Sequence, residues 1–210
     1  MMGWQYKLMN LTSLEVGVFR GFYEGMPKDP YMGGEFRTRR HSSVQKTSEG
    51  HYKSLPHTTF TQSYDVNKLV GEVERTFEPL DDKLVATDDF AKVVDAFAEM
   101  SGFDATKEEI GIHQVRVKCA KDIEGDPAPE GRHQDGFKYI GIFVTERHNI
   151  EGGFSELYLT ADPDEKPFME KILDNHELLI VNDKAVFHNA TGITPTADEG
   201  GYRDVFVLTA

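Results

Sequence analysis

The pattern of apolar residues changes at residue 111, and this change constrains the fold more than any other feature of the sequence. From there to residue 210, apolar residues alternate with polar ones or form short runs, which is typical of β-strands with one or both faces buried. One helix is predicted in this half, over KPFMEKILDN (166–175), and a hairpin turn is predicted at Asn182-Asp183 or Asp183-Lys184. The predicted strands are GIHQVRVKC (111–119), FKYIGIFVT (137–145), FSELYLT (154–160), HELLIVND (176–183), KAVFHNA (184–190) and YRDVFVLTA (202–210).

The first 110 residues have a different character. HTTFTQSY (57–64) predicts a strand, and two segments with apolar residues at helical spacing predict amphipathic helices over 66–77 and 88–102. Asp88 is expected to cap the start of the second helix and Gly102 its end. The whole pattern predicts an α+β, mainly β fold, in which helices pack on an antiparallel barrel or sandwich with a small-molecule site in its mouth.

Composition narrows the class of protein. Hydrophobic residues make up 39% of the 210 residues, so one domain is expected, with an N-terminal elaboration (1–110) and a β core (111–210). A net charge of −13 repels phosphate backbones and argues against nucleic acid as a partner. No apolar run approaches the roughly 20 residues that cross a bilayer, and one cysteine allows no internal disulfide, so the expected location is the cytoplasm. Composition does not determine the oligomeric state.

A candidate metal site lies in the stretch PEGRHQDGF (129–137). In an extended chain, residues i and i+2 project from the same face, so His133 and Asp135 could reach one ion. His188, at the end of a predicted strand, offers a third ligand. Two imidazoles and one carboxylate form the facial triad of non-haem Fe(II) oxygenases, although three ligands also suit catalytic zinc. The alternative is a turn with a surface histidine and a capping aspartate.

Arginines near this site suggest an anionic ligand. Arg203 begins the last predicted strand, 15 residues after His188, and a guanidinium there could pair with a carboxylate on a metal-bound cosubstrate. The alternative is a surface arginine that pairs with Asp204 or Asp198. The basic stretch RTRRH (37–41) is either a solvated loop or a patch that attracts a carboxylate substrate to the mouth of the site.

Three motifs together resemble the iron(II)/2-oxoglutarate-dependent dioxygenases. These are the Pro-Glu-Gly-x-His-Gln-Asp-Gly core at 129–136, the Arg-x-Asn-x-x-Gly-Gly segment at 147–153, and the Arg-Asp pair at 203–204. They are similar to those of the bacterial amino-acid hydroxylases that include L-isoleucine 4-hydroxylase. The resemblance is strong over about 110–210 and fainter over 30–80.

The resemblance implies a fold and a chemistry. The fold would be a double-stranded β-helix (a cupin-like jelly roll) with helices that buttress one sheet. Fe(II) would be held by His133, Asp135 and His188, and 2-oxoglutarate by the metal and Arg203, with O2 as the oxidant. Known members hydroxylate free L-amino acids, mostly aliphatic ones.

Other residues are weaker candidates for ligand contacts. Tyr139 lies four residues after Asp135 and could contact 2-oxoglutarate, or it could form a wall of the core. Arg116 could bind a substrate carboxylate, or it could be a barrel-surface residue. Arg147 and Asn149 could shape the rim of the site, although Gly152-Gly153 beside them could mark only a turn or bulge.

Three other functions remain open at this stage. The same oxygen chemistry could act on a carrier-tethered or peptidyl amino acid. A cupin-like metalloenzyme could use the triad without oxygen chemistry. A non-enzymatic barrel could bind a small acid as a sensor.

Overall fold

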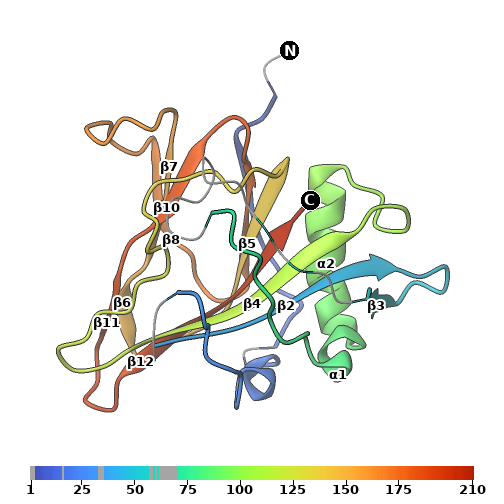
Figure 1. Cartoon of the computed structure of the whole chain (residues 1–210), viewed down its shortest axis with the longest axis horizontal. Helices are drawn as coiled ribbons and strands as arrows, with labels where there is room; N and C mark the ends of the chain where they lie inside the picture. The colour runs from blue at the N-terminus through green and yellow to red at the C-terminus, as the bar shows by residue number, and fades with distance from the viewer. Residues whose placement is uncertain (1–2, 16, 33–35, 57–58, 60, 62–70) are drawn as a thin grey trace.

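Two antiparallel β-sheet layers enclose the interior, and two α-helices cover the outer face of the larger sheet (Figure 1). The computed structural model describes residues 3–15, 17–32, 36–56, 59, 61 and 71–210. The larger sheet has the strand order β1-β9-β5-β12-β4-β2-β3, and the opposite layer consists of the sheets β10-β7-β8 and β11-β6. This arrangement is the predicted double-stranded β-helix, or jelly roll, with buttressing helices.

The elements have these bounds. The strands are β1 (Tyr6–Asn10), β2 (Arg37–Lys46), β3 (Tyr52–Ser54), β4 (Ile110–Cys119), β5 (Tyr139–His148), β6 (Ile150–Gly152), β7 (Phe154–Tyr158), β8 (Met169–Ile172), β9 (Glu177–Asn182), β10 (Phe187–Ala190), β11 (Ile193–Pro195) and β12 (Gly201–Thr209). The helices are the 3₁₀ turn η1 (Arg20–Phe22), α1 (Asp82–Val85) and α2 (Asp88–Ser101).

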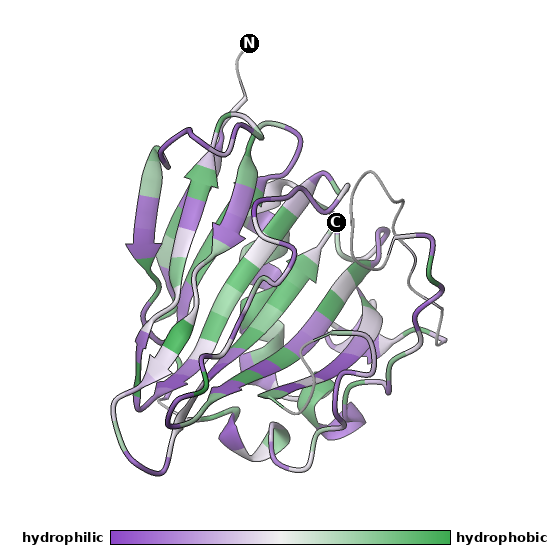
Figure 2. Cartoon of the chain, turned by 60° about the vertical axis from the view of Figure 1, so that its left-hand side comes forward, coloured by the Kyte–Doolittle hydropathy of each residue, from purple (hydrophilic) through white to green (hydrophobic). Residues whose placement is uncertain are grey.

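Alternation along each strand divides the larger sheet into two faces. On β12, Phe206 and Leu208 belong to the core under the helices, whereas Val205 belongs to the core between the sheets. The same strand therefore contributes to both cores, as a two-faced strand with period two must. Figure 2 shows this banding as alternating green and purple along the strands.

Helix α2 follows the prediction with one correction. Its buried face includes Phe90, Val93 and Phe97, and the helix ends at Gly102, whose φ of +76° suits a glycine cap. Thr87, and not Asp88, is the N-cap, because the Thr87 side chain accepts a hydrogen bond from the Phe90 backbone N–H.

Two helix predictions are wrong where the structure describes the segment. Residues 71–77 contain no helix, because Glu72 has a φ of +59° and Val73 is exposed while Arg75 is buried. Residues 166–175 contain strand β8, which pairs with β7, so tertiary pairing overrides the local helical pattern. Residues 66–70, and most of the strand predicted over 57–64, lie outside the described residues.

The predicted hairpin at residues 182–184 is also corrected. A turn is present there, since Ala185 N–H donates to the Asn182 carbonyl at 2.9 Å. However, β9 pairs with β5 and β1, whereas β10 pairs with β7. The turn therefore carries the chain from one sheet layer to the other.

The first 110 residues contribute more than an elaboration of helices. They supply β1, β2 and β3, which are three of the seven strands of the larger sheet. The expectation of a single domain stays a prediction. No helix in the described part of the chain combines the length and apolar character that a membrane span requires.

Candidate metal centre and ligand pocket

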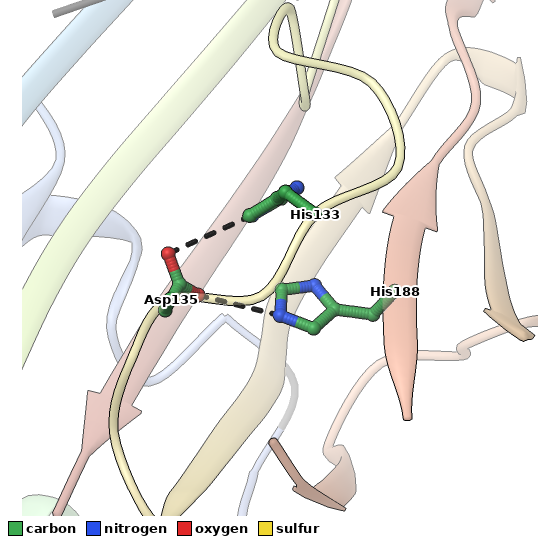
Figure 3. A group of neighbouring side chains, drawn as sticks. All are labelled: His133, Asp135 and His188. Carbon is green, nitrogen blue, oxygen red and sulfur yellow. Dashed lines mark ion pairs between the residues drawn. The ribbon is translucent and has the colours of Figure 1, made fainter. Parts of the chain in front are cut away.

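Three side chains converge at the opening between the two sheet layers: His133, Asp135 and His188 (Figure 3). Nε2 of His133 lies 3.6 Å from Oδ1 of Asp135, and Nε2 of His188 lies 3.4 Å from Oδ2. One possible ligand atom from each residue lies within 4.8 Å of the others. This group of nitrogen and oxygen donors could hold one metal ion.

The backbone brings the two histidines together. His133 and His188 form an isolated antiparallel bridge, with N···O distances of 3.0 and 2.9 Å in the two directions. Apart from this bridge, residues 131–138 form a loop and not the strand on which the i, i+2 spacing was interpreted. The ligands nevertheless share one side, because the bridge and the turn at Gly136, with a φ of +86°, aim them there.

Asp183 fixes the loop from behind, although the sequence indicated only a turn residue there. It is buried, and its carboxylate accepts hydrogen bonds from the backbone N–H groups of Asp135 (3.1 Å) and Gly136 (2.8 Å). His188 Nε2 also lies 3.2 Å from Asp183 Oδ1. Such outer carboxylates orient metal-ligating residues.

The backbone orients the His133 ring. Its Nδ1–H donates to the Gly131 carbonyl at 2.7 Å, which leaves Nε2 on the side that faces Asp135. Gly131 has a φ of +70°, a conformation that favours glycine.

The electrostatics of the three residues favour a bound cation. Burial alone would raise the pKa of Asp135, but hydrogen bonds from His133 and His188 lower it well below its usual value. Burial works to lower the pKa of His188, yet hydrogen bonds to Asp135 and Asp183 raise it to about 10. Without a metal, this site therefore keeps a proton that a metal would displace.

A pocket of about 930 Å³, its open mouth included, extends from these residues over the inner face of the larger sheet. Its apolar lining includes Val115 and Val117 of β4, Val205 and Val207 of β12, and Ile142 of β5.

Arg203 lies in this pocket with open hydrogen-bonding capacity. Its side chain is buried, and neither Nε nor Nη2 has a hydrogen-bond partner among the described residues. Burial, with repulsion from Arg147 and Arg37, lowers its pKa to about 10. The alternative pairing with Asp204 is wrong, because Asp204 projects to the opposite face and pairs with Arg116. A buried guanidinium without partners fits the carboxylate of a ligand.

The basic stretch at 37–41 lies on strand β2 and not in a solvated loop, and two of its arginines line the pocket. Arg37 and Arg39 alternate along β2 and line the pocket. Arg37 Nη1 donates to the Pro127 carbonyl at 3.0 Å, and Arg39 Nη2 donates to His113 Nδ1 at 2.8 Å. Arg75, which sequence reasoning missed, also lines the pocket and is 2% exposed.

Two of the weaker candidates project away from the pocket. Arg116 is buried on the opposite face of β4, where Nε and Nη2 donate to Asp204 at 2.7 Å each and Nη1 to Glu24 at 3.0 Å. Tyr139 stacks on Trp4, with 4.7 Å between ring centroids, and packs on the helix-side core. The four-residue spacing of Tyr139 from Asp135 does not place the two side chains on one face, because a loop and not a regular strand joins them.

The other two candidates lie beyond the pocket lining. Arg147 is the cross-strand partner of Arg203, and its Nη2 donates to the Gly152 carbonyl at 2.8 Å. Asn149 donates from Nδ2 to Glu199 at 3.1 Å and helps form the connection between β5 and β6. Neither residue lines the pocket.

Comparisons with known proteins place this geometry in a family. A curated relative, L-isoleucine-4-hydroxylase from Bacillus thuringiensis, is 24% identical over 193 residues, which cover 89% of this chain and 79% of the relative. The solved structure of a bsmA homologue from Methylobium petroleophilum is 26% identical with a TM-score of 0.75, covering 91% of this chain and 78% of that one. The structure of IDO from Bacillus thuringiensis shares the fold at 20% identity and a TM-score of 0.66, over 85% and 76% of the two chains.

The match to a family model covers most of the chain. The model of the 2OG-Fe dioxygenases matches residues 20–209, a range that contains the three candidate metal ligands and Arg203. Enzymes of this family use Fe(II), 2-oxoglutarate and O2, and the donor set at His133, Asp135 and His188 fits such a metal. The chain therefore belongs to the 2OG-Fe dioxygenase family and is an oxidoreductase.

Proposed function

We propose that this enzyme hydroxylates a free aliphatic L-amino acid, with succinate and CO2 as the other products. One observation carries the proposal: the three candidate metal ligands and the buried Arg203, with its open donors, line one pocket. The reaction balances as R–H + 2-oxoglutarate + O2 → R–OH + succinate + CO2.

His133, Asp135 and His188 would hold Fe(II). Three protein ligands leave coordination positions for a cosubstrate and O2. When bound, the iron and 2-oxoglutarate together supply the oxidising chemistry, in which the cosubstrate loses CO2 and one oxygen atom reaches the substrate.

The protein's own residues bind and orient. Arg203 would bind the carboxylate of 2-oxoglutarate that lies far from the metal, because its guanidinium is buried in the same pocket and can form two parallel hydrogen bonds. Asp183 keeps the ligand loop in place through Asp135 and Gly136. The valines of β4 and β12 exclude water from the space beside the metal.

Two observations support an aliphatic amino acid. The pocket floor between the metal ligands and Arg203 consists largely of valine and isoleucine side chains, which suit an aliphatic chain. The curated relative at 24% identity is named for the hydroxylation of L-isoleucine.

Turnover of 2-oxoglutarate tests the proposal. Purified protein is mixed with Fe(II), ascorbate and 2-oxoglutarate in air, with each free L-amino acid in turn. Succinate is quantified, and each amino acid is examined by mass spectrometry for one added oxygen atom. A matched reaction with the Asp135→Ala variant serves as the control for iron that is not held by the protein.

The outcomes separate the parts of the proposal. Succinate in equal amount to one hydroxylated aliphatic amino acid is the expected result. Succinate without any modified amino acid would contradict the substrate class but keep the cosubstrate. No succinate from protein that retains bound iron would overturn the proposed reaction.

A further inference from the structure

A second cationic region lines the pocket on the side away from Arg203. In the larger sheet β4 separates β12 from β2, and Arg203, Val117 and Arg37 form one cross-strand row, followed by Val205, Val115 and Arg39. Strands are about 4.8 Å apart, so the arginines of β2 and β12 arise about 10 Å apart with a valine floor between them. Arg75 also lines the pocket.

Arg39 is held stiffly, yet part of its guanidinium is open. Its Nη2 donates to His113 Nδ1, its Nη1 lies 3.8 Å from Asp29 Oδ2, and its Cζ lies 4.3 Å from the centre of the Phe77 ring. Asp29 is itself fixed, because its Oδ1 accepts from the backbone N–H groups of Tyr31 and Met32. The Arg39 Nε atom is buried and has no hydrogen-bond partner among the described residues.

Arginines outnumber carboxylates among the described residues that line the pocket. Four described arginines line it (Arg37, Arg39, Arg75 and Arg203), against two carboxylates (Glu130 and Asp135). The Asp29 carboxylate, behind Arg37 and Arg39, pairs with both. The excess of cationic groups that face the pocket suits a ligand that carries a carboxylate.

Glu130 places one negative charge beside the metal ligands. Its Oε1 lies 3.5 Å from His133 Nε2, and its Oε2 is buried with no hydrogen-bond partner in the described part of the chain. Burial lowers the pKa of Arg75, and Asp29 and Glu130 act against that shift. Glu130 lines the same pocket as Arg39 and Arg75, which suits a ligand with adjacent carboxylate and ammonium groups.

We propose that Arg39 and Arg75 bind the α-carboxylate of the substrate and that Glu130 binds its ammonium group. This inference rests on the proposed function, because it assigns residues to the amino acid of that reaction. A peptidyl or carrier-tethered amino acid has no free α-carboxylate to accept a hydrogen bond from the buried Arg39 Nε. The pocket therefore selects a free amino acid.

The test removes one charge from the ligand and one from the protein, in a thermodynamic cycle. The protein is loaded with Mn(II) and 2-oxoglutarate without O2, and binding is measured by calorimetry. The ligand is the amino acid that gives most succinate in the turnover screen, or L-isoleucine if none does. Its carboxamide lacks the carboxylate charge, and the matching 2-hydroxy acid lacks the ammonium group.

For the native protein, the carboxamide is expected to bind about tenfold to a hundredfold more weakly than the amino acid, as for the loss of a charge-assisted hydrogen bond. In Arg39→Met or Arg75→Met, the affinity for the amino acid is expected to fall by a similar factor, and the carboxamide should bind only slightly more weakly than the amino acid. Arg39→Lys keeps the charge and should therefore recover part of the difference in affinity between the amino acid and the carboxamide. Glu130→Gln is expected to abolish discrimination against the 2-hydroxy acid and leave discrimination against the carboxamide intact.

Arg40→Met is the matched control. Arg40 is the next residue on β2 but projects to the other face, where it donates to the Pro79 carbonyl and lies 3.4 Å from Glu78. This variant should bind all three ligands as the native protein does. Circular dichroism and 2-oxoglutarate affinity identify a variant that has failed to fold. If Arg39→Met fails to fold, the affinities of Arg39→Lys decide whether Arg39 binds the carboxylate.

Several results would overturn the inference while leaving the proposed chemistry in place. The first is equal affinity of the native protein for the amino acid and its carboxamide. The second is a preference for the amino acid over the carboxamide that is as large in both arginine variants as in the native protein. The third is a protein that produces succinate but binds no free amino acid. Absence of succinate under every condition would instead overturn the proposed function, and calorimetry would still decide whether the carboxylate subsite exists.

Discussion

Arg116 and Arg203 lie on neighbouring strands of the same sheet, each 4% exposed, and their surroundings are opposite. On the helix-covered face, the Arg116 guanidinium donates to Asp204 and Glu24. On the pocket face, the Nε and Nη2 atoms of Arg203 have no hydrogen-bond partner among the described residues. Because an unpaired buried charge is costly, the paired Arg116 stabilises the fold, whereas Arg203 remains the predicted partner of a ligand carboxylate.

The two arginines lie on different faces of the sheet because successive side chains along a strand project to opposite faces. Arg203 and Asp204 are consecutive in the sequence and project to opposite faces of β12. Substitutions on the pocket face should therefore change ligand binding more than stability, and those on the helix face should do the reverse.

The largest effect is expected at the metal ligands. Asp135→Ala removes the carboxylate between the two histidines and should lower succinate formation by more than about a thousandfold, because the metal loses a charged ligand. Metal analysis of the purified protein measures the loss of iron directly. Asp126→Ala, which alters an exposed carboxylate earlier in the same loop, is the control; equal iron content in both variants would contradict the assigned site.

The opposite kind of effect is expected at Arg116. Arg116→Met leaves Asp204 buried without its partner and should lower the free energy of unfolding by about 3–5 kcal/mol. Urea denaturation measures this loss. The affinity of the folded fraction for 2-oxoglutarate should not change, and a weakened affinity with unchanged stability would reverse the roles of the two faces.

The affinity of the candidate site for a metal ion should depend on pH. The pKa of His188 in the metal-free protein is about 10, above its unfolded value near 6.5, so its proton stabilises the fold below pH 6.5 and this contribution disappears toward pH 10. A metal competes with that proton. The affinity for Mn(II) should therefore rise by up to about tenfold per pH unit between pH 6.5 and 9.5. Calorimetry at three pH values tests this; a constant affinity would show that His188 is not a ligand.

The smallest effect is expected at Tyr139. Tyr139→Leu removes the stacking on Trp4 and should cost about 0.5–1.5 kcal/mol of stability, with no change in the KM for 2-oxoglutarate. Thermal denaturation and succinate formation measure the two quantities. A raised KM with unchanged stability would return Tyr139 to the cosubstrate site.

The sequence predicted the parts of the site that depend on residue type and local alternation. His133, Asp135, His188 and Arg203, which the structure brings to one pocket, could be selected as candidates because few residue types bind iron and carboxylates. The fold class could be predicted because apolar and polar residues alternate regularly along the strands.

Features that depend on tertiary pairing could not be predicted. Strand β8 has a helical pattern and becomes a strand only because β7 pairs with it. Arg75 lies within the segment 66–77 that was predicted to be a helix, and its burial in the pocket follows from a chain path that no periodicity reveals. Likewise, no sequence pattern indicates the bulge that leaves Thr145 without a cross-strand partner between the pairs Asp204–Glu146 and Val205–Val144.

Titration of 2-oxoglutarate into the Mn(II)-loaded native protein, Arg203→Met and Arg116→Met tests the contrast between the two faces most directly. The native protein should bind 2-oxoglutarate only when the metal is present. Arg203→Met should weaken this binding by about tenfold to a hundredfold with little loss of stability, and Arg116→Met should bind as the native protein does. Native-like affinity in Arg203→Met, or equal weakening in both variants, would contradict the assignment of the cosubstrate to the pocket face.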